Sequence, residues 1–88
     1  MYELVYSKQS LKDIPKLKSA KLDKQAKALL AVMQQNPYQI PPPYEKLRGN
    51  LKGAYSRRIN RTHRLVYEVF EDKRIVRIIS MWTHYESV

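Results

Sequence analysis

The C-terminal half of the sequence contains three consecutive segments of β-strand character, at about residues 54–60, 64–70 and 74–83. Turn-forming residues at 60–62 and 71–73 separate them, so we expect the three segments to pair as an antiparallel meander. The last segment, RIVRIISMW, is apolar at both alternating positions and is therefore predicted to be the central strand.

The N-terminal half predicts one short strand followed by two helices. The strand is YELVY, and Ser7 can cap the helix after it. Apolar residues then recur at spacings of three and four, in two groups: Leu11, Ile14 and Leu17, then Leu22, Ala26, Leu29, Leu30 and Met33. Pro15 should kink or restart the first helix, and Asn36-Pro37 should end the second. The order β-α-α-β-β-β predicts an α+β fold, with both helices on one face of a small antiparallel sheet.

A segment rich in proline joins the two halves. Residues 37–53 contain four of the five prolines and both glycines. Tyr38, Ile40, Tyr44 and Leu47 can anchor this segment to a core, so we expect an ordered loop rather than a flexible linker.

Length and composition favour one small domain, residues 1–88, with the cytoplasm as its default location. A chain of 88 residues has enough apolar material for a single modest core. It has no cysteine and no apolar run long enough for a membrane span, and its N-terminus does not resemble a signal peptide.

The chain is strongly basic, with 17 Lys and Arg against 8 Asp and Glu and a formal net charge of +9. Such a charge favours a polyanionic partner, although solubility alone is an alternative reason for it. The cations of residues 8–27 are all lysines, whereas five of the seven in residues 46–64 are arginines. Because the planar guanidinium suits phosphate, we predict RNA binding by this second group, at Arg48, Arg57, Arg58 and Arg61.

The remaining polar residues suit metal-independent cleavage of RNA. No metal-ligand spacing and no glycine-rich nucleotide loop is present, so neither a metal nor another cofactor is predicted. Attack by the RNA 2′-hydroxyl on its own phosphodiester needs a base, an acid and fixed positive charge. The candidates for these roles are Glu45, Arg57, Arg58, Arg61, His63, Arg64, His84 and Tyr85.

Several of these candidates have structural interpretations. Glu45 has Lys46 beside it and can form a surface ion pair, and His63 is most simply a structural residue. His84 lies close to the C-terminus, where chains often fray. The hairpin register is also open, because a two-residue turn pairs Ile59 with Arg64 and a three-residue turn pairs Arg58 with Arg64.

Two stretches, YEKLRGNLKGAYSRRINRTHRLVYEV and SMWTHYES, together resemble the YoeB/Txe toxins of the RelE superfamily, over about residues 44–86. These toxins belong to bacterial type II toxin–antitoxin systems. The resemblance implies a RelE-like microbial RNase fold. It also implies metal-independent cleavage of mRNA in the A site of the 70S ribosome, with inhibition of translation.

The same resemblance assigns catalytic roles to four residues. Glu45 would be the general base, Arg64 the clamp on the transition state, and His84 the general acid, while Tyr85 would orient the RNA or the leaving group. Residues Glu86 to Val88 extend past the point where many family members end, which leaves the exact position of Tyr85 open.

The implied partners are the ribosome with its mRNA, and a YefM/Axe-like cognate antitoxin whose acidic, disordered segment folds over the basic groove. A toxin homodimer is also implied. The alternative function is a non-catalytic basic module that binds RNA or protein, as in ParE-like relatives of the same fold that act on DNA gyrase.

Overall fold

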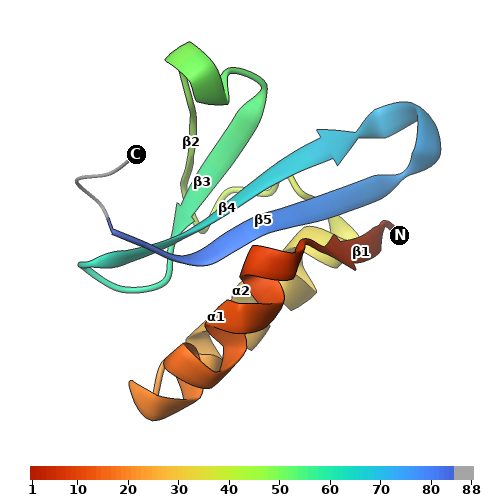
Figure 1. Cartoon of the computed structure of the whole chain (residues 1–88). Helices are drawn as coiled ribbons and strands as arrows, with labels where there is room; N and C mark the ends of the chain where they lie inside the picture. The colour runs from red at the N-terminus through yellow and green to blue at the C-terminus, as the bar shows by residue number, and fades with distance from the viewer. Residues whose placement is uncertain (85–88) are drawn as a thin grey trace.

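The computed structural model describes residues 1–84, which form two helices packed on a five-stranded sheet (Figure 1). The predicted α+β class, both helices and the three-stranded meander are confirmed. The elements are β1 (Glu3–Tyr6), α1 (Lys8–Ser19), α2 (Asp23–Gln35), β2 (Tyr44–Lys46), the short 3₁₀ helix η1 (Gly49–Leu51), β3 (Ala54–Arg58), β4 (His63–Phe70), the 3₁₀ helix η2 (Glu71–Lys73) and β5 (Ile75–His84).

The sheet has the order β1-β5-β4-β3-β2 and differs from the prediction in two respects. It is mixed rather than antiparallel, because β1 runs parallel to β5, with Glu3 opposite Ile75. The middle strand is β4 rather than β5. The apolar pattern of β5 is explained by its interior position, since β1 and β4 hydrogen bond to its two edges.

The ordered loop predicted over residues 37–53 contains a strand that was not predicted. Three of these residues form the edge strand β2, which pairs antiparallel with β3. A strand this short, directly after three prolines, gives too little alternation to be recognised in the sequence. In Figure 1 the β2–β3 hairpin and η1 rise from the sheet on the side away from the helices.

The first helix begins at the predicted cap. The Ser7 Oγ accepts a hydrogen bond from the Ser10 backbone N–H at 3.0 Å and donates one to the Ile79 carbonyl at 2.7 Å. Pro15 lies inside α1, which continues as one element from Lys8 to Ser19, so the predicted restart does not occur. The cap therefore joins the start of α1 to the middle of β5.

The hydrophobic core lies between the two helices and the face of the sheet that they cover (Figure 1). Three of the helical residues in the predicted apolar spacing, Leu17, Ala26 and Met33, are at most 2% exposed, whereas Leu11, which the same spacing included, is 52% exposed. Residues of β4 and β5, with Ile59 just after β3, contribute the sheet side of the core: Ile59, Leu65, Tyr67, Val76, Ile78 and Met81. The opposite face of the meander is not covered by a helix and carries polar side chains.

The pairing of β4 with β5 is irregular in two places, between Arg64 and Val66 and between Val66 and Tyr67. Asp13 of α1 compensates for one of these irregularities. Its carboxylate is 1% exposed, and Oδ2 accepts a hydrogen bond at 2.9 Å from the backbone N–H of Met81. A buried N–H that lacks its ladder partner is costly, so Asp13 stabilises the bulged form of β5 just before Trp82.

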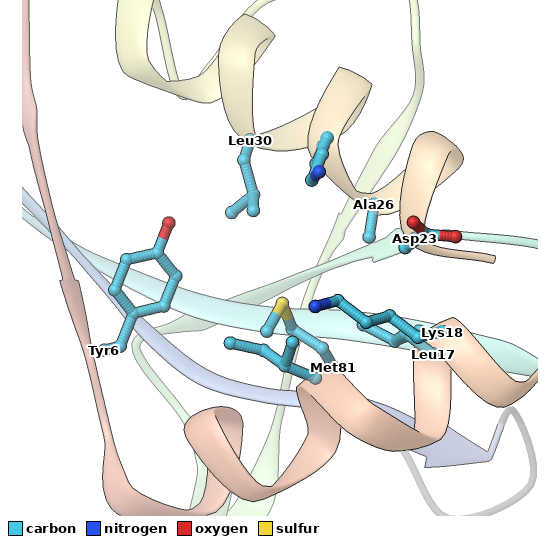
Figure 2. A pocket seen from close by; sticks show the side chains of 9 residues that line it. Tyr6, Leu17, Lys18, Asp23, Ala26, Leu30 and Met81 are labelled. Carbon is cyan, nitrogen blue, oxygen red and sulfur yellow. The ribbon is translucent and has the colours of Figure 1, made fainter.

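A groove of about 170 Å³ lies between α1 and α2 (Figure 2). Leu17 of α1 faces Ala26 and Leu30 of α2, and Met81 lies between them. This lining is mostly apolar and includes none of the predicted site residues. Neither helix within residues 1–84 is long and apolar enough to cross a membrane.

Candidate active site

The structure settles the register of the β3–β4 hairpin. Arg58 lies opposite Arg64, and the Ile59 N–H donates to the His63 carbonyl at 2.9 Å, which leaves a three-residue turn. On the next pair of strands, Glu45 lies opposite Ser56. Because side chains alternate along a strand, Glu45, Ser56, Arg58 and Arg64 share the face of the sheet that the helices leave uncovered.

Glu45 and Arg64 meet on this face. Arg64 Nη2 donates to Glu45 Oε1 at 3.0 Å, and the side chains are 2% and 62% exposed, respectively. Arg64 Nη1 donates to the hydroxyl of Ser56 at 2.8 Å, and Ser56 is fully buried. The Arg64 guanidinium is thus held by the buried Ser56, while the Glu45 carboxylate faces solvent.

Ser56 was not predicted as a site residue, although one signal in the sequence was available. It lies two residues before Arg58, so strand alternation places both on one face. Two further hydroxyls lie near this face: Thr83 is opposite Arg64, and Ser80 is opposite Val66 and hydrogen bonds to Thr83.

His84 is not part of the Glu45–Arg64 contact. It ends β5 opposite His63, and the two imidazoles meet edge to face with centroids 4.9 Å apart. The other side of the His63 ring lies against Trp82, with centroids 3.9 Å apart. Because His63 and Arg64 are consecutive in β4, these rings lie on the side of the strand opposite the Arg64 guanidinium. The structure thus brings together two of the four predicted catalytic residues, and Tyr85 lies outside the described residues.

His63 occupies an unusual environment for a histidine. Within residues 1–84, neither of its ring nitrogens has a hydrogen-bond partner, and both are buried. Burial, and secondly the charge of His84, lowers the pKa of His63 below its ordinary value of 6.5. The ring therefore stays neutral near neutral pH, in agreement with the structural interpretation of this residue.

This shift predicts a pH-dependent stability. In the unfolded chain His63 takes up a proton near pH 6.5, whereas the folded protein resists protonation there, so added protons favour unfolding. We expect the melting temperature of the wild type to fall between about pH 7 and pH 5. His63→Phe keeps a ring against Trp82 and should show a smaller fall in the same thermal scans. Equal pH dependence of the two proteins would contradict this account.

The prediction that Arg57 binds RNA is corrected by its position. Arg57 is 0% exposed, and its guanidinium donates to the carbonyls of Pro37, Gln39 and Pro42 at 2.6–2.9 Å and to the Tyr67 hydroxyl at 3.1 Å. The cation also lies 5.1 Å from the centroid of the Tyr44 ring. Arg57 therefore anchors the proline-rich segment to the sheet instead of facing a ligand.

The other three residues of the predicted RNA-binding group are exposed. Arg48 lies just before η1, Arg58 ends β3, and Arg61 lies in the β3–β4 turn. RNA binding by these three remains a prediction. Within residues 1–84 no group of three or more His, Cys, Asp or Glu is placed to hold a metal ion.

A sequence comparison identifies the family. Residues 6–85 match the family model described as the YoeB-like toxin of the bacterial type II toxin–antitoxin system. The chain belongs to the YoeB toxin family. Two relatives, both described as toxin YoeB, support this assignment. The Synechocystis protein is 39% identical over 66 residues, which cover 75% of this chain and 74% of the relative. The Streptomyces coelicolor protein is 38% identical over 56 residues, which cover 64% and 67% of the two chains.

Solved structures of YoeB proteins share the fold. The YoeB/ParE toxin from Agrobacterium tumefaciens matches with a TM-score of 0.84 at 27% identity, covering 94% of this chain and 99% of that one. YoeB in the heterotetrameric YoeB–YefM complex from Staphylococcus aureus matches with a TM-score of 0.79 at 34% identity, covering 97% and 99%. The Staphylococcus aureus YoeB dimer matches with a TM-score of 0.77 at 34% identity, covering 96% and 98%. The YoeB family and the RelE-like fold predicted from the sequence are both confirmed.

Proposed function

We propose that this YoeB-family toxin is a metal-independent endoribonuclease that cleaves mRNA in the A site of the ribosome. The observation that carries the proposal is the contact of the exposed Glu45 carboxylate with the buried Arg64 guanidinium. This contact places a proton acceptor and a fixed positive charge side by side on the uncovered face of a basic protein. Those are two of the three groups that cleavage by the 2′-hydroxyl needs.

In the proposed reaction, Glu45 accepts the proton of the 2′-hydroxyl as the 2′-oxygen attacks the adjacent phosphorus. The bond between phosphorus and the 5′-oxygen breaks, and the leaving oxygen takes a proton from His84. The products are a 2′,3′-cyclic phosphate and a 5′-hydroxyl. Arg64 exchanges its contact with Glu45 for the phosphoryl oxygens, and Ser56 keeps the guanidinium in place during this exchange.

His84 must leave His63 before it can reach the leaving oxygen. Its ring lies on the side of the sheet opposite the Arg64 guanidinium, so rotation of the side chain alone is not sufficient, and the proposal requires the exposed end of β5 to turn when RNA binds. Local motions of this kind are fast compared with turnover. The assignment of His84 as general acid, and that of Tyr85 in orienting the RNA, rest on the resemblance of the terminal HY to the family pattern. Exposed Arg48, Arg58 and Arg61 would hold the neighbouring RNA backbone.

We also propose a YefM-like antitoxin as the partner that controls this activity. A Staphylococcus aureus YoeB forms a complex with YefM, and a YoeB from the same organism has been solved as a dimer. An acidic antitoxin segment would compete with RNA for the same cations. Homodimerisation is the second association that we propose for this chain.

The test uses purified toxin with ribosomes translating a defined message, and primer extension to map the cuts. We expect cuts at the A-site codon and none in a message whose attacking nucleotide carries 2′-deoxyribose. Cleavage of the deoxy message would exclude attack by the 2′-hydroxyl. An intact normal message together with inhibition of DNA gyrase would instead establish the ParE-like alternative.

A further inference from the structure

A second group of cations lies on the β2–β3 hairpin, beyond the Glu45–Arg64 contact. From residue 46 to residue 67 the sequence contains no Asp or Glu but seven Lys or Arg. Three of these cations, Lys46, Arg48 and Lys52, surround one hollow of about 350 Å³. We call this hollow, lined by residues 46–49 and 52–55, the hairpin hollow.

The three cations are available to a ligand. All are exposed, and within residues 1–84 none has a carboxylate close enough for an ion pair. Unpaired cations this close together repel one another, and a bound anion relieves that repulsion. The three cations around the hairpin hollow therefore suit an anionic ligand.

The base of the hairpin hollow is built from ordered parts of the sheet. The Leu47 N–H donates to the Ala54 carbonyl at 2.9 Å, and the ring of Tyr55 stacks on that of Tyr67 with centroids 5.5 Å apart. Gly49 and Gly53, both in the connection between β2 and β3, have φ angles of +69° and +96°. Residues other than glycine rarely adopt such φ angles, so the two glycines allow the backbone of this connection to take its shape.

The hairpin hollow adjoins the proposed reaction site. Lys46 follows Glu45 directly, and strand alternation turns the two side chains to opposite faces of β2. Because β2 is an edge strand, an extended ligand on the Glu45 face can pass around this edge without meeting another strand. A polymer with a charge at every unit would then meet Arg64 on one face and Lys46 on the other, with Arg48 and Lys52 in the connection that follows β2.

We propose that the hairpin hollow is a second phosphate subsite, in which Lys46, Arg48 and Lys52 bind the backbone of single-stranded RNA next to the scissile linkage. This inference rests on the proposed endoribonuclease function and extends it to two residues, Lys46 and Lys52, with no role in the cleavage step. The repeated charge of a nucleic acid backbone matches a row of exposed cations around the edge of a sheet.

The experiment compares two double variants that each remove two positive charges. One is Lys46→Ala with Lys52→Ala. The matched control is Lys12→Ala with Lys24→Ala, two exposed lysines on α1 and α2. The probe is a fluorescent, single-stranded 2′-O-methyl RNA, which cannot be cleaved through its 2′-oxygen. Its affinity is measured by anisotropy between about 50 and 200 mM salt, a range over which phosphate contacts weaken strongly.

We expect the hairpin variant to bind the probe more weakly and to lose about 1.4 from the slope of log affinity against log salt, because each phosphate contact on a single strand contributes about 0.7. The control should keep the wild-type slope. Equal slopes in the two variants would overturn the proposed subsite. It would also be overturned if the hairpin variant kept its affinity for the RNA probe and lost affinity only for an acidic peptide. The probe cannot be cut, so the binding comparison between the two variants does not depend on catalysis. If the toxin leaves mRNA intact in the separate cleavage assay, the endoribonuclease proposal is refuted, and the binding comparison still tests the subsite.

Discussion

Replacing Glu45 by glutamine is expected to slow mRNA cleavage by about 10²- to 10⁴-fold, the usual contribution of a general base. Glutamine keeps the size of the side chain and an oxygen that can accept from Arg64, but it cannot take the proton of the 2′-hydroxyl. Because Glu45 is 62% exposed, the melting temperature should change little. Single-turnover cleavage on programmed ribosomes, with a thermal melt of the same preparation, measures both effects.

Glu3→Gln is the matched control, since it removes one negative charge from an exposed position on β1, at the opposite edge of the sheet. It should cleave at the wild-type rate. A Glu45→Gln protein that cleaves as fast as this control would remove Glu45 from the reaction. Arg64 is less suitable for the test, because it is 2% exposed and bonded to Ser56, so its replacement affects folding as well.

Replacing Arg57 by methionine is expected to cause the largest loss of stability of any single arginine change in this chain. Methionine is similar in length but cannot donate, so three backbone carbonyls and the Tyr67 hydroxyl lose a charged donor in a buried place. A single buried group left without its partner costs about 1–3 kcal/mol, so a total of at least about 3 kcal/mol is expected. For a domain of this size, that lowers the melting temperature by more than about 10 °C.

Arg61→Met provides the comparison for stability, because Arg61 is exposed in the β3–β4 turn. Its free energy of unfolding should stay within about 0.5 kcal/mol of the wild type, as is usual for surface substitutions. Urea denaturation followed by circular dichroism measures both variants. Similar losses in the two variants would show that the hydrogen bonds of Arg57 contribute no more than an average surface side chain.

The helices and the meander could be predicted from the sequence because their signals are repeated several times. The first helix has apolar residues at a spacing of three, the second at spacings of three and four, and each long strand is bounded by a turn. The parallel pairing of β1 with β5 had no such signal. It joins residues more than seventy positions apart, and no local pattern records which edge of a sheet a distant strand will occupy.

The site could be predicted in part, because its residues were recognisable by type but not by orientation. Arg57 and Arg58 are adjacent and chemically identical, yet strand alternation sends one into the protein and the other to the surface. Which of them is buried depends on the register with β4, which the turn sequence left open. Ser56 and Asp13 were missed for a related reason, since each is important only through a contact with a distant residue.

The bond between Asp13 and Met81 connects residues separated by 68 positions. Because β5 is an interior strand and follows every other described element in the sequence, the growing polypeptide cannot complete the sheet while β5 is still unsynthesised. The helices are made before β5, so the sheet face that they pack against is complete only after β5 has been synthesised. A newly made copy of this toxin is thus expected to remain unfolded until β5 has been synthesised.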